Sequence, residues 1–458
     1  MKMLVAMADR FPSQRMYLDL VLTLLLVRCR YPDRWRLLLD AVHSVSLHTA
    51  LQRALWELAV AHGEPDGHWQ HDSALEERDF EIGEVIHILN GVPTAWLDEP
   101  DDALAPVLFD LLVDRFLTIE GRLATDYNTP ASVVRLMVSL LAPISAGSRI
   151  HDPHCRTGNL LAVAVAQLAG AASEAAGVIV TGRDPDLQKC RLARMRLALI
   201  GVSARLVSDY EYGLLGPPSE PGLYDVVLTD PPFNYRGPVH PSFECFRWPF
   251  GEPPANANFA WLQYAVYLLR EGGRAVMVMA NNASFSSQPR EQHIRRAMIE
   301  NGAVECVIAL PSHLFTGSAI APTLWILKKP TGRGDDILFI DAHSLGHMQS
   351  RIRRVLLDSD IDKIVNTHRV GRTEPHADAR PPEVESISRA VTFGEIRDRD
   401  YSLNPATYVK SQPATGPGAP SVEGPPDLVA ELDDLESQAA EIDAKVRGLI
   451  RGLGLWTR

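Results

Sequence analysis

The sequence predicts an α/β protein in which a mostly parallel, doubly wound sheet follows a helical region and precedes a single C-terminal helix. Three observations support this fold class. Apolar residues recur at helical spacing up to about residue 106. From residue 131 onward, short apolar runs alternate with helical patterns, as strands and helices do around a parallel sheet. Near the end of the chain, a stretch rich in Pro, Gly and Ser precedes a regular apolar repeat.

Composition indicates a soluble, globular, cytoplasmic protein. The 458 residues are 46% hydrophobic and 22% charged, which suffices for a sizeable core in roughly two to four domains. The apolar stretch at residues 18–27 is interrupted by Asp19 and is shorter than the roughly 20 residues of a bilayer span, and no signal-peptide pattern precedes it. The 5 cysteines form no C-x-x-C pair, which argues against disulfides and a cysteine zinc site. No metal is expected.

The net charge of −12 has the wrong sign for a protein whose whole surface attracts nucleic acid. A polyanion must therefore meet a local patch or a surface that a partner provides.

Residues 1–120 are predicted to form an N-terminal helical domain. Similar helical spacing recurs around residues 51–58 and 85–89, and the acidic, Gly- and Pro-containing residues 64–79 are interpreted as a loop. The clearest helical face carries five apolar residues: Leu18, Val21, Leu22, Leu25 and Leu26.

Residues 121–410 are predicted to form the α/β domain. Helices are expected at residues 132–141, 160–168, 187–199 and 259–269. Strands are expected at residues 149–151, 178–181, 226–228, 275–279, 304–308 and 323–327. Sheets of this kind bind ligands in the crevice beyond the carboxyl ends of their strands. Asp152, Asp184 and Asp230 each follow such an end and are therefore candidate site residues.

The last part of the chain is predicted to be a linker at residues 411–426 and an amphipathic helix for partner assembly at residues 427–458. A helix that packs on its own domain is the alternative for the second segment. The apolar seam of this helix spans about four heptads and consists of Leu428, Leu432, Leu435, Ala439, Ile442, Val446, Leu449 and Leu453.

The tetrapeptide Asp230-Pro231-Pro232-Phe233 follows a predicted strand and has the chemistry to hold an exposed amine. The acid offers an oxygen to an N–H group, and prolines, with φ fixed at about −65° and no N–H, can aim their carbonyls at the same amine. An aromatic ring can stack on a base taken out of a duplex. Taken alone, the tetrapeptide is also consistent with a Pro-rich turn that closes a strand.

The stretch at residues 150–159 is placed to bind a cofactor. A tight turn between a strand and a helix brings backbone N–H groups and a helix N-terminus close to a ligand, and Gly158 allows a close approach. Asp184 follows the next strand, where an acidic residue can accept both hydroxyls of a ribose. Taken alone, an aspartate at this place is more often a surface residue than a ligand-binding one, but three such strand ends in one sheet favour a site.

Three motifs in this order resemble the amino-methylating DNA methyltransferases, specifically the modification subunit of type I restriction-modification systems. They are Tyr127-Asn128-Thr129-Pro130, Asp152-Pro153-x-Cys155-x-Thr157-Gly158 and Asp230-Pro231-Pro232-Phe233. Further likeness lies at residues 247–254, 256–263, 272–274, 310–315, 337–342 and 401–409, so the resemblance covers about residues 125–409.

The resemblance implies a Rossmann-like class I methyltransferase fold with S-adenosylmethionine as cofactor and adenine N6 in double-stranded DNA as substrate. It also implies a sequence-specificity subunit as partner, with a second modification subunit or a nuclease subunit as further partners, and no membrane association. Asp184 would take the ribose hydroxyls and Asp209 would lie beside the cofactor adenine. The cofactor site as a whole would be lined by Tyr127, Asn128, Thr129, Pro130, Asp152, His154, Cys155, Thr157, Gly158, Asn159, Asp184 and Asp209.

The same resemblance implies that Asp230, Pro231, Pro232 and Phe233 are the catalytic residues. Asp230 and the Pro231 carbonyl would hold the target N6 amine. Phe233 and Phe315 would flank the flipped adenine.

Residues 152–159, which we call the cofactor loop, depart from the family pattern D-P-A-C-G-[ST]-G-G. His154, Arg156 and Asn159 replace an alanine and two glycines. A glycine at the second of these positions accommodates a strained turn or a ligand pressed against the backbone. An arginine at this position has one of three consequences: its side chain obstructs the turn, points outward into solvent, or pairs with the cofactor carboxylate. Asp230 stands where relatives usually carry Asn and accepts the same hydrogen bond.

Three interpretations of function follow. The first is an active adenine-N6 DNA methyltransferase that works with a sequence-reading subunit, since the chain has no evident DNA-reading domain of its own. The second is a methyltransferase-fold protein with weakened or lost catalysis that serves as a DNA-binding or scaffold component of a defence complex, which Arg156 favours. The third is a methyltransferase for another planar amine, such as cytosine N4, RNA or a protein glutamine.

Overall fold

The computed structural model describes residues 2–42, 44, 47–61, 78–92, 104–119, 129–169, 177–208, 221–237, 246–315, 319–373 and 387–409. The chain divides into two compact units, residues 1–410 and residues 411–458. The predicted linker and C-terminal helix lie outside the described residues, as do Tyr127, Asn128 and Asp209.

The N-terminal region is helical, in agreement with the helical spacing of its sequence. Its helices are α1 (Lys2–Met7), α2 (Gln14–Arg30), α3 (Pro32–Ala41), α4 (Leu47–Ala61), α5 (Asp79–Asn90) and α6 (Leu104–Ile119), with the 3-10 turn η1 (Ala8–Arg10). The longest of them, α2, begins where the Ser13 hydroxyl accepts a hydrogen bond from the Met16 N–H. The predicted domain boundary at residue 120 falls outside the described residues and stays a prediction.

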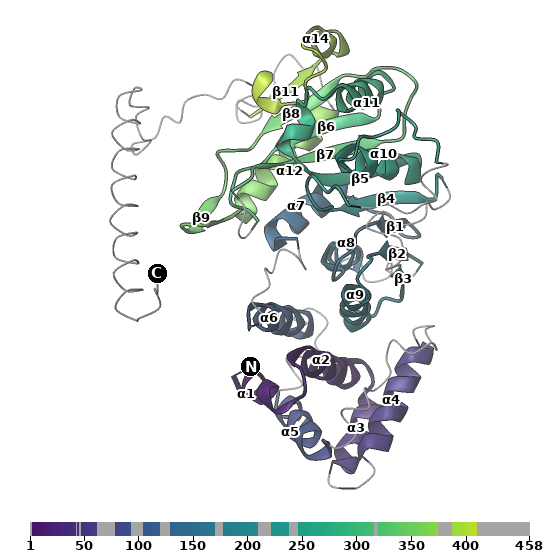
Figure 1. Ribbon diagram of the computed structural model, residues 1–458, viewed down its shortest axis with the longest axis vertical. Helices are drawn as coiled ribbons and strands as arrows, with labels where there is room; N and C mark the ends of the chain where they lie inside the picture. Colours follow the sequence, from purple (N-terminus) through teal and green to yellow (C-terminus); the bar gives the residue numbers. More distant parts are fainter. Residues whose placement is uncertain are drawn as a thin grey trace, which may run out of the picture. The chain divides into compact units, whose positions relative to one another are not determined.

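A sheet of 9 strands forms the centre of the α/β region, in the order β11-β8-β6-β7-β5-β4-β1-β2-β3 (Figure 1). All neighbouring strands pair in parallel except β7, which is antiparallel to β5 and β6, and β11, which is antiparallel to β8. The prediction of a largely parallel sheet is thus confirmed. The strands are β1 (Arg149–Asp152), β2 (Ile179–Arg183), β3 (Ala204–Val207), β4 (Tyr224–Thr229), β5 (Leu269–Ala280), β6 (Val304–Ala309), β7 (Pro322–Lys328), β8 (Ile337–Asp341) and β11 (Ser388–Val391).

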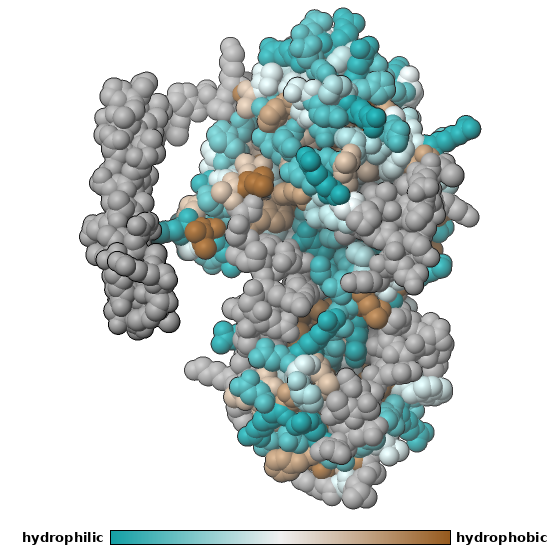
Figure 2. Space-filling view, in the orientation of Figure 1, coloured by the Kyte–Doolittle hydropathy of each residue, from teal (hydrophilic) through white to brown (hydrophobic). Residues whose placement is uncertain are grey.

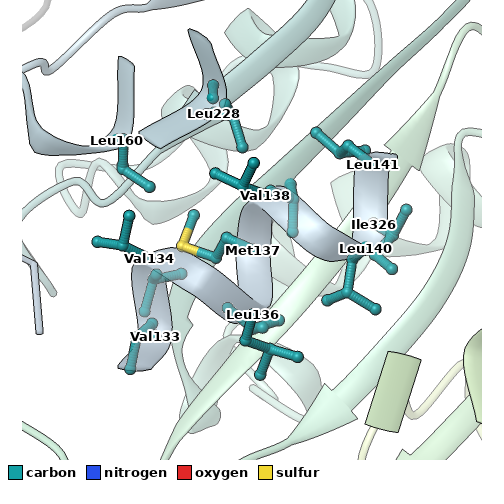
Figure 3. Packing of buried hydrophobic residues seen from close by; sticks show 14 of the residues in the cluster. Val133, Val134, Leu136, Met137, Val138, Leu140, Leu141, Leu160, Leu228 and Ile326 are labelled. Carbon is teal, nitrogen blue, oxygen red and sulfur yellow. The ribbon is translucent and has the colours of Figure 1, made fainter. Parts of the chain in front are cut away.

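Helices cover both faces of this sheet, as a doubly wound fold requires. Alternate residues of β5 show the two faces, because Val276 packs in the apolar cluster with α7 and α8, whereas Met277 packs in the cluster with α10 and α11. In Figure 3, Val138 of α7 lies beside Leu228 of β4. The helices are α7 (Ala131–Leu141), α8 (Asn159–Ala169), α9 (Leu187–Leu199), α10 (Asn258–Leu268), α11 (Pro289–Glu300), α12 (Asp358–Thr373) and α14 (Phe393–Asp398), with 3-10 turns η7 (Asn281–Ser284) and η8 (Pro405–Thr407).

Helix α9 joins the N-terminal helices to the sheet. Its Cys190 and Ala193 pack in the core of the sheet, whereas its Leu192 and Met195 pack in the core of the N-terminal helices. The side chain of Asp186 caps the helix by accepting a hydrogen bond from the Gln188 N–H at 2.8 Å.

The strand pairings place several carboxyl ends at one edge of the sheet, which we call the carboxyl edge. Strands β1, β2, β4 and β5 run in one direction, and β6 and β8 share it because β7 is antiparallel to both β5 and β6. Asp152, Asp184 and Asp230 all lie at this edge, as the sequence predicted. Among the residues described above, no helix is long and apolar enough to span a bilayer.

Candidate active site

Asp230 lies directly after β4 and is almost completely buried, with 1% of its surface exposed. Its Oδ2 accepts a hydrogen bond of 2.8 Å from the Thr129 hydroxyl. Its backbone carbonyl accepts one of 3.0 Å from Arg156 Nη2 and lies 3.2 Å from His154 Nδ1. The candidate amine holder is therefore tied to both the segment that precedes α7 and the loop that follows β1.

The loop from Asp152 to Asn159 is a tight turn built from its own hydrogen bonds. Asp152 Oδ1 accepts a bond of 2.9 Å from the His154 N–H, and the Gly158 N–H donates to the Cys155 carbonyl at 2.7 Å. Gly158 has a φ of 76°, and a Cβ atom added there would meet the Cβ of Ala193 in α9 at 2.9 Å. Glycine is thus required here by the close approach of α9 as well as by the turn.

Arg156 turns inward. It adopts a φ of 48°, a left-handed conformation that is costly for a residue with a Cβ. Its side chain is buried, and Nη2 lies 3.5 Å from Oδ2 of Asp230. The arginine that interrupts the family pattern therefore forms a buried ion pair with the candidate amine holder.

Asp184 follows β2 and is held from two sides by backbone groups. Its Oδ2 accepts a bond of 3.0 Å from the Arg156 N–H, and its Oδ1 accepts one of 2.9 Å from the Asp186 N–H. His154 Nε2 lies 3.7 Å from the same Oδ2. His154 and Arg156 thus connect the carboxylates of Asp184 and Asp230, which are far apart in the sequence.

Burial controls the protonation of these groups. It raises the pKa of Asp152 to about 7 and also raises the pKa values of Asp184 and Asp230. At Asp230 the guanidinium of Arg156 and the hydroxyl of Thr129 lower the pKa against this trend. The pKa of His154 falls well below its usual value because the ring is buried and faces Arg156, so the imidazole is neutral. The site is an array of buried acids in which the Arg156 guanidinium faces Asp230.

Two aromatic rings lie next to the amine holder. Phe233 and Phe315 meet edge to face with ring centroids 5.9 Å apart, and we call them the aromatic pair. Phe233 is half-buried, and Phe315, which follows β6, is buried. The family resemblance implies that both residues flank the target base; the structure shows that their rings are in contact.

An asparagine network that no sequence motif indicated fixes the chain directly after Phe233. Asn234 has a φ of 54°, and its N–H donates to Asn258 Oδ1 at 3.0 Å. Its side-chain oxygen accepts bonds from Asn256, Asn258 and Asn282 at 3.0 to 3.3 Å. The likeness at residues 256–263 pointed to this region but gave no role to these amides.

Arg196 of α9 is a second support that the sequence did not reveal. Its Nη1 donates to the Thr157 carbonyl at 2.6 Å and to the Thr157 hydroxyl at 2.8 Å. Its Nη2 pairs with Asp110 of α6, and its guanidinium lies 5.1 Å from the Phe109 ring centroid. The N-terminal helices are thereby connected to the cofactor loop.

The remaining predicted residues have structural partners in the same place. Asn159 Nδ2 donates to the Thr129 carbonyl at 2.8 Å, and the Cys155 N–H donates to the Arg183 carbonyl at 2.7 Å. The Pro130 carbonyl accepts the first bonds of α7, from Val133 and Val134. Pro231 is buried and Pro232 half-buried.

Comparison with known proteins gives a consistent result. The family model described as N-6 DNA Methylase matches residues 101–415. The chain is 30% identical over 355 residues to the type I restriction enzyme HindI methylase subunit of Haemophilus influenzae, covering 76% of this chain and 77% of that protein. It is 28% identical to the MjaIX methylase subunit of Methanocaldococcus jannaschii, covering 76% of this chain and 62% of that protein.

Solved structures show the same fold. The type I restriction-modification methyltransferase subunit from Streptococcus thermophilus matches with a TM-score of 0.63 at 24% identity, covering 83% of this chain and 81% of that one. A modification subunit of a type I restriction enzyme from Vibrio vulnificus matches with a TM-score of 0.61 at 18% identity, covering 83% and 86%.

Proposed function

This chain belongs to the N-6 DNA methylase family, and we propose that it is the modification subunit of a type I restriction-modification or related defence system. In this role it transfers a methyl group from S-adenosylmethionine to adenine N6 in double-stranded DNA. A sequence-specificity subunit selects the site, and a second modification subunit or a nuclease subunit completes the assembly.

The observation that carries this proposal is Asp230 at the end of β4, with the aromatic pair beside it. A buried carboxylate accepts hydrogen bonds from an amino group, and aromatic rings flank a base that has left its duplex. Asp230 is 1% exposed, so it serves a group that is brought into the protein rather than one that stays in solvent.

The donor set at the carboxyl edge fits the proposed cofactor. Asp184 offers a carboxylate at the position for ribose hydroxyls, held by two backbone N–H groups. The turn from Asp152 to Asn159 offers backbone groups at the start of α8. The Asn159 side chain donates a hydrogen bond to the Thr129 carbonyl across this turn. S-adenosylmethionine, when bound, supplies an electrophilic methyl group. Arg156 offers a guanidinium that suits the cofactor's carboxylate.

The mechanism that follows is positioning with electrostatic stabilisation. Asp230 and the Pro231 carbonyl accept the two N–H bonds of the target amine, which turns the nitrogen lone pair toward the methyl donor. Phe233 and Phe315 hold the base and exclude water. The carboxylate of Asp230 stabilises positive charge as it develops on the nitrogen, a contribution typical of preorganised sites. After transfer the nitrogen releases one proton to the Asp230 carboxylate that accepts its hydrogen bond, and S-adenosylhomocysteine would be the leaving group.

A second function, a catalytically weakened DNA-binding or scaffold component, is favoured by one observation. Arg156 Nη2 lies 3.0 Å from the Asp230 carbonyl and 3.5 Å from its Oδ2, so the amine holder already has a cationic partner from its own chain.

Calorimetry with S-adenosylmethionine separates the two functions. The active enzyme binds the cofactor as the unmodified chain, whereas the weakened protein shows no binding until Arg156→Gly clears the loop. Binding by neither form would refute the proposed cofactor. Mass spectrometry of nucleosides from treated DNA then tests the base, because N4-methylcytosine as product would contradict the adenine assignment.

A further inference from the structure

Beyond the sheet, the chain forms a two-stranded antiparallel arm from β9 (His347–Ser350) and β10 (Arg353–Val355). Figure 1 shows β9 projecting away from the sheet. Most of the arm is exposed: three of the four residues of β9 are exposed, as are Arg351, Ile352 and Arg353. An exposed arm of this kind has no role in the core, and its surface chemistry indicates what it contacts.

The arm leaves the sheet at the carboxyl edge, where Asp230 lies. It follows β8, whose carboxyl end is at that edge because β8 is parallel to β6. The Arg354 N–H donates to the His313 carbonyl at 2.8 Å. His313 belongs to the same segment as Phe315, whose ring meets Phe233. The arm is therefore anchored to the segment that provides one ring of the aromatic pair.

The surface of the arm is basic on a chain whose net charge is −12. Within the described part of the chain, no carboxylate lies within ion-pair distance of Arg351 or Arg353. The nearby start of α12 does not supply one, because Asp358 pairs with Arg135 and Asp360 accepts the Leu357 N–H at 2.9 Å. Arg354, in contrast, is committed to the Leu345 carbonyl at 3.1 Å.

Between the two exposed arginines, Ile352 leaves 62% of its surface exposed. In Figure 2, which has the orientation of Figure 1, hydrophilic and hydrophobic side chains lie together at the position of β9. Two cations around one apolar side chain suit a duplex, because phosphates accept guanidinium hydrogen bonds and apolar side chains contact sugars and base edges in a groove.

We propose that the β9–β10 arm binds the backbone of duplex DNA next to the flipped base, with Arg351 and Arg353 on phosphates and Ile352 against the groove. The inference rests on the proposed function for the nature of the polyanion. Charge complementarity selects DNA over a protein partner, since this arm provides cations near the active site of an otherwise acidic chain.

The test is the affinity of the full chain for a fluorescein-labelled duplex of mixed sequence, measured by fluorescence anisotropy at a series of KCl concentrations. For R351Q/R353Q, the plot of log affinity against log salt is expected to become shallower by roughly 0.9 for each phosphate that the protein no longer neutralises. Ile352→Ser is expected to lower affinity without changing this slope, because an apolar contact releases no counterions.

The matched control is R333Q/R397Q, which removes the same charge from the opposite edge of the sheet. Arg333 precedes β8 and Arg397 lies in α14 after β11, and their side chains are 83% and 59% exposed. The control is expected to keep the slope of the unmodified chain. Equal slopes for both double variants would overturn the proposal, as would absence of duplex binding by the unmodified chain at the lowest salt.

Two further outcomes are informative. If R351Q/R353Q binds the duplex normally but fails to assemble with the specificity subunit, the arm is a protein contact and the proposal is wrong. The proposed function is judged separately by the methylated product: a chain that methylates DNA with an unaltered salt slope in R351Q/R353Q refutes the arm alone. If the unmodified chain forms no methylated product but R351Q/R353Q shows a shallower plot of log affinity against log salt, the methyltransferase assignment is refuted and the arm remains a DNA contact.

Discussion

Replacing Arg156 by methionine is expected to destabilise the protein, and the loss is expected to grow as pH rises. Methionine keeps the length of the side chain and its Cβ at a φ of 48° but removes the charge that faces Asp230. Other ionisable groups near Asp230 are Asp152, which carries the same charge, and His154, which is neutral because burial lowers its pKa. Arg156 is therefore the cation that this carboxylate depends on.

The distance sets the size of the effect. With Nη2 and Oδ2 separated by 3.5 Å, two unit charges attract by about 5 kcal/mol at an effective dielectric constant of about 20. Removing one partner of a buried pair typically costs about 3–5 kcal/mol of unfolding free energy. Burial already raises the pKa of Asp230, and loss of Arg156 raises it further. A raised pKa in the folded state means stability that is present at low pH and lost as pH rises through that pKa.

The assay is denaturant unfolding, followed by circular dichroism at acidic and alkaline pH, for Arg156→Met, Asp230→Asn and the double variant. The expected result is a loss of about 3 kcal/mol at alkaline pH for Arg156→Met, a smaller loss at acidic pH, and a double variant that is clearly more stable than additivity predicts. Arg156→Gly separates strain from charge, because it relieves about 1 kcal/mol of left-handed strain. Additive single losses, within about 0.5 kcal/mol, would refute the pair.

Three further predictions concern the cofactor loop. Asp152→Asn should raise the unfolding free energy at pH 8 but change it little at pH 3. Burial raises the Asp152 pKa to about 7, so stability is lost as pH rises from the unfolded-state pKa of about 4 to that value; equal effects at both pH values would contradict this. Gly158→Ala should destabilise the protein by about 2 kcal/mol or more in melting experiments, because the new Cβ atom would lie 2.9 Å from the Cβ of Ala193. An unchanged melting midpoint would show that α9 shifts to make room and would contradict this prediction. Arg196→Met should weaken cofactor binding measured by calorimetry, because Thr157 loses both of its hydrogen bonds to Nη1. The control variant Arg191→Met, on the same helix, should bind the cofactor normally. Equal losses of affinity in both variants would assign the effect to α9 as a whole.

The parts of the fold that the sequence predicted correctly are those with strong local patterns. Strands β1, β2 and β4 are mostly buried, and each has an aspartate at or just after its end. The predicted helix at residues 187–199 has the bounds of α9. Strands β3 and β11 did not stand out, because each has only four residues and is partly exposed. The antiparallel direction of β7 depends on its connections and not on its composition.

The sequence predicted the acidic residues of the candidate site but only part of its geometry. Motif positions identified Asp152, Asp184 and Asp230 because each follows a strand. The direction of the Arg156 side chain depends on its backbone conformation, which residue identity alone does not give. The bonds from Arg196 to Thr157 and from the asparagines to Asn234 join residues that are distant in the sequence, so no local pattern reports them.

The most direct test of the central claim is modification mapping of genomic DNA from cells that carry the gene, lack it, or carry Asp230→Ala. We predict N6-methyladenine at one sequence motif in the first case and its loss in the other two. The same methylation pattern in all three would contradict the claim that this chain, through Asp230, methylates adenine in DNA.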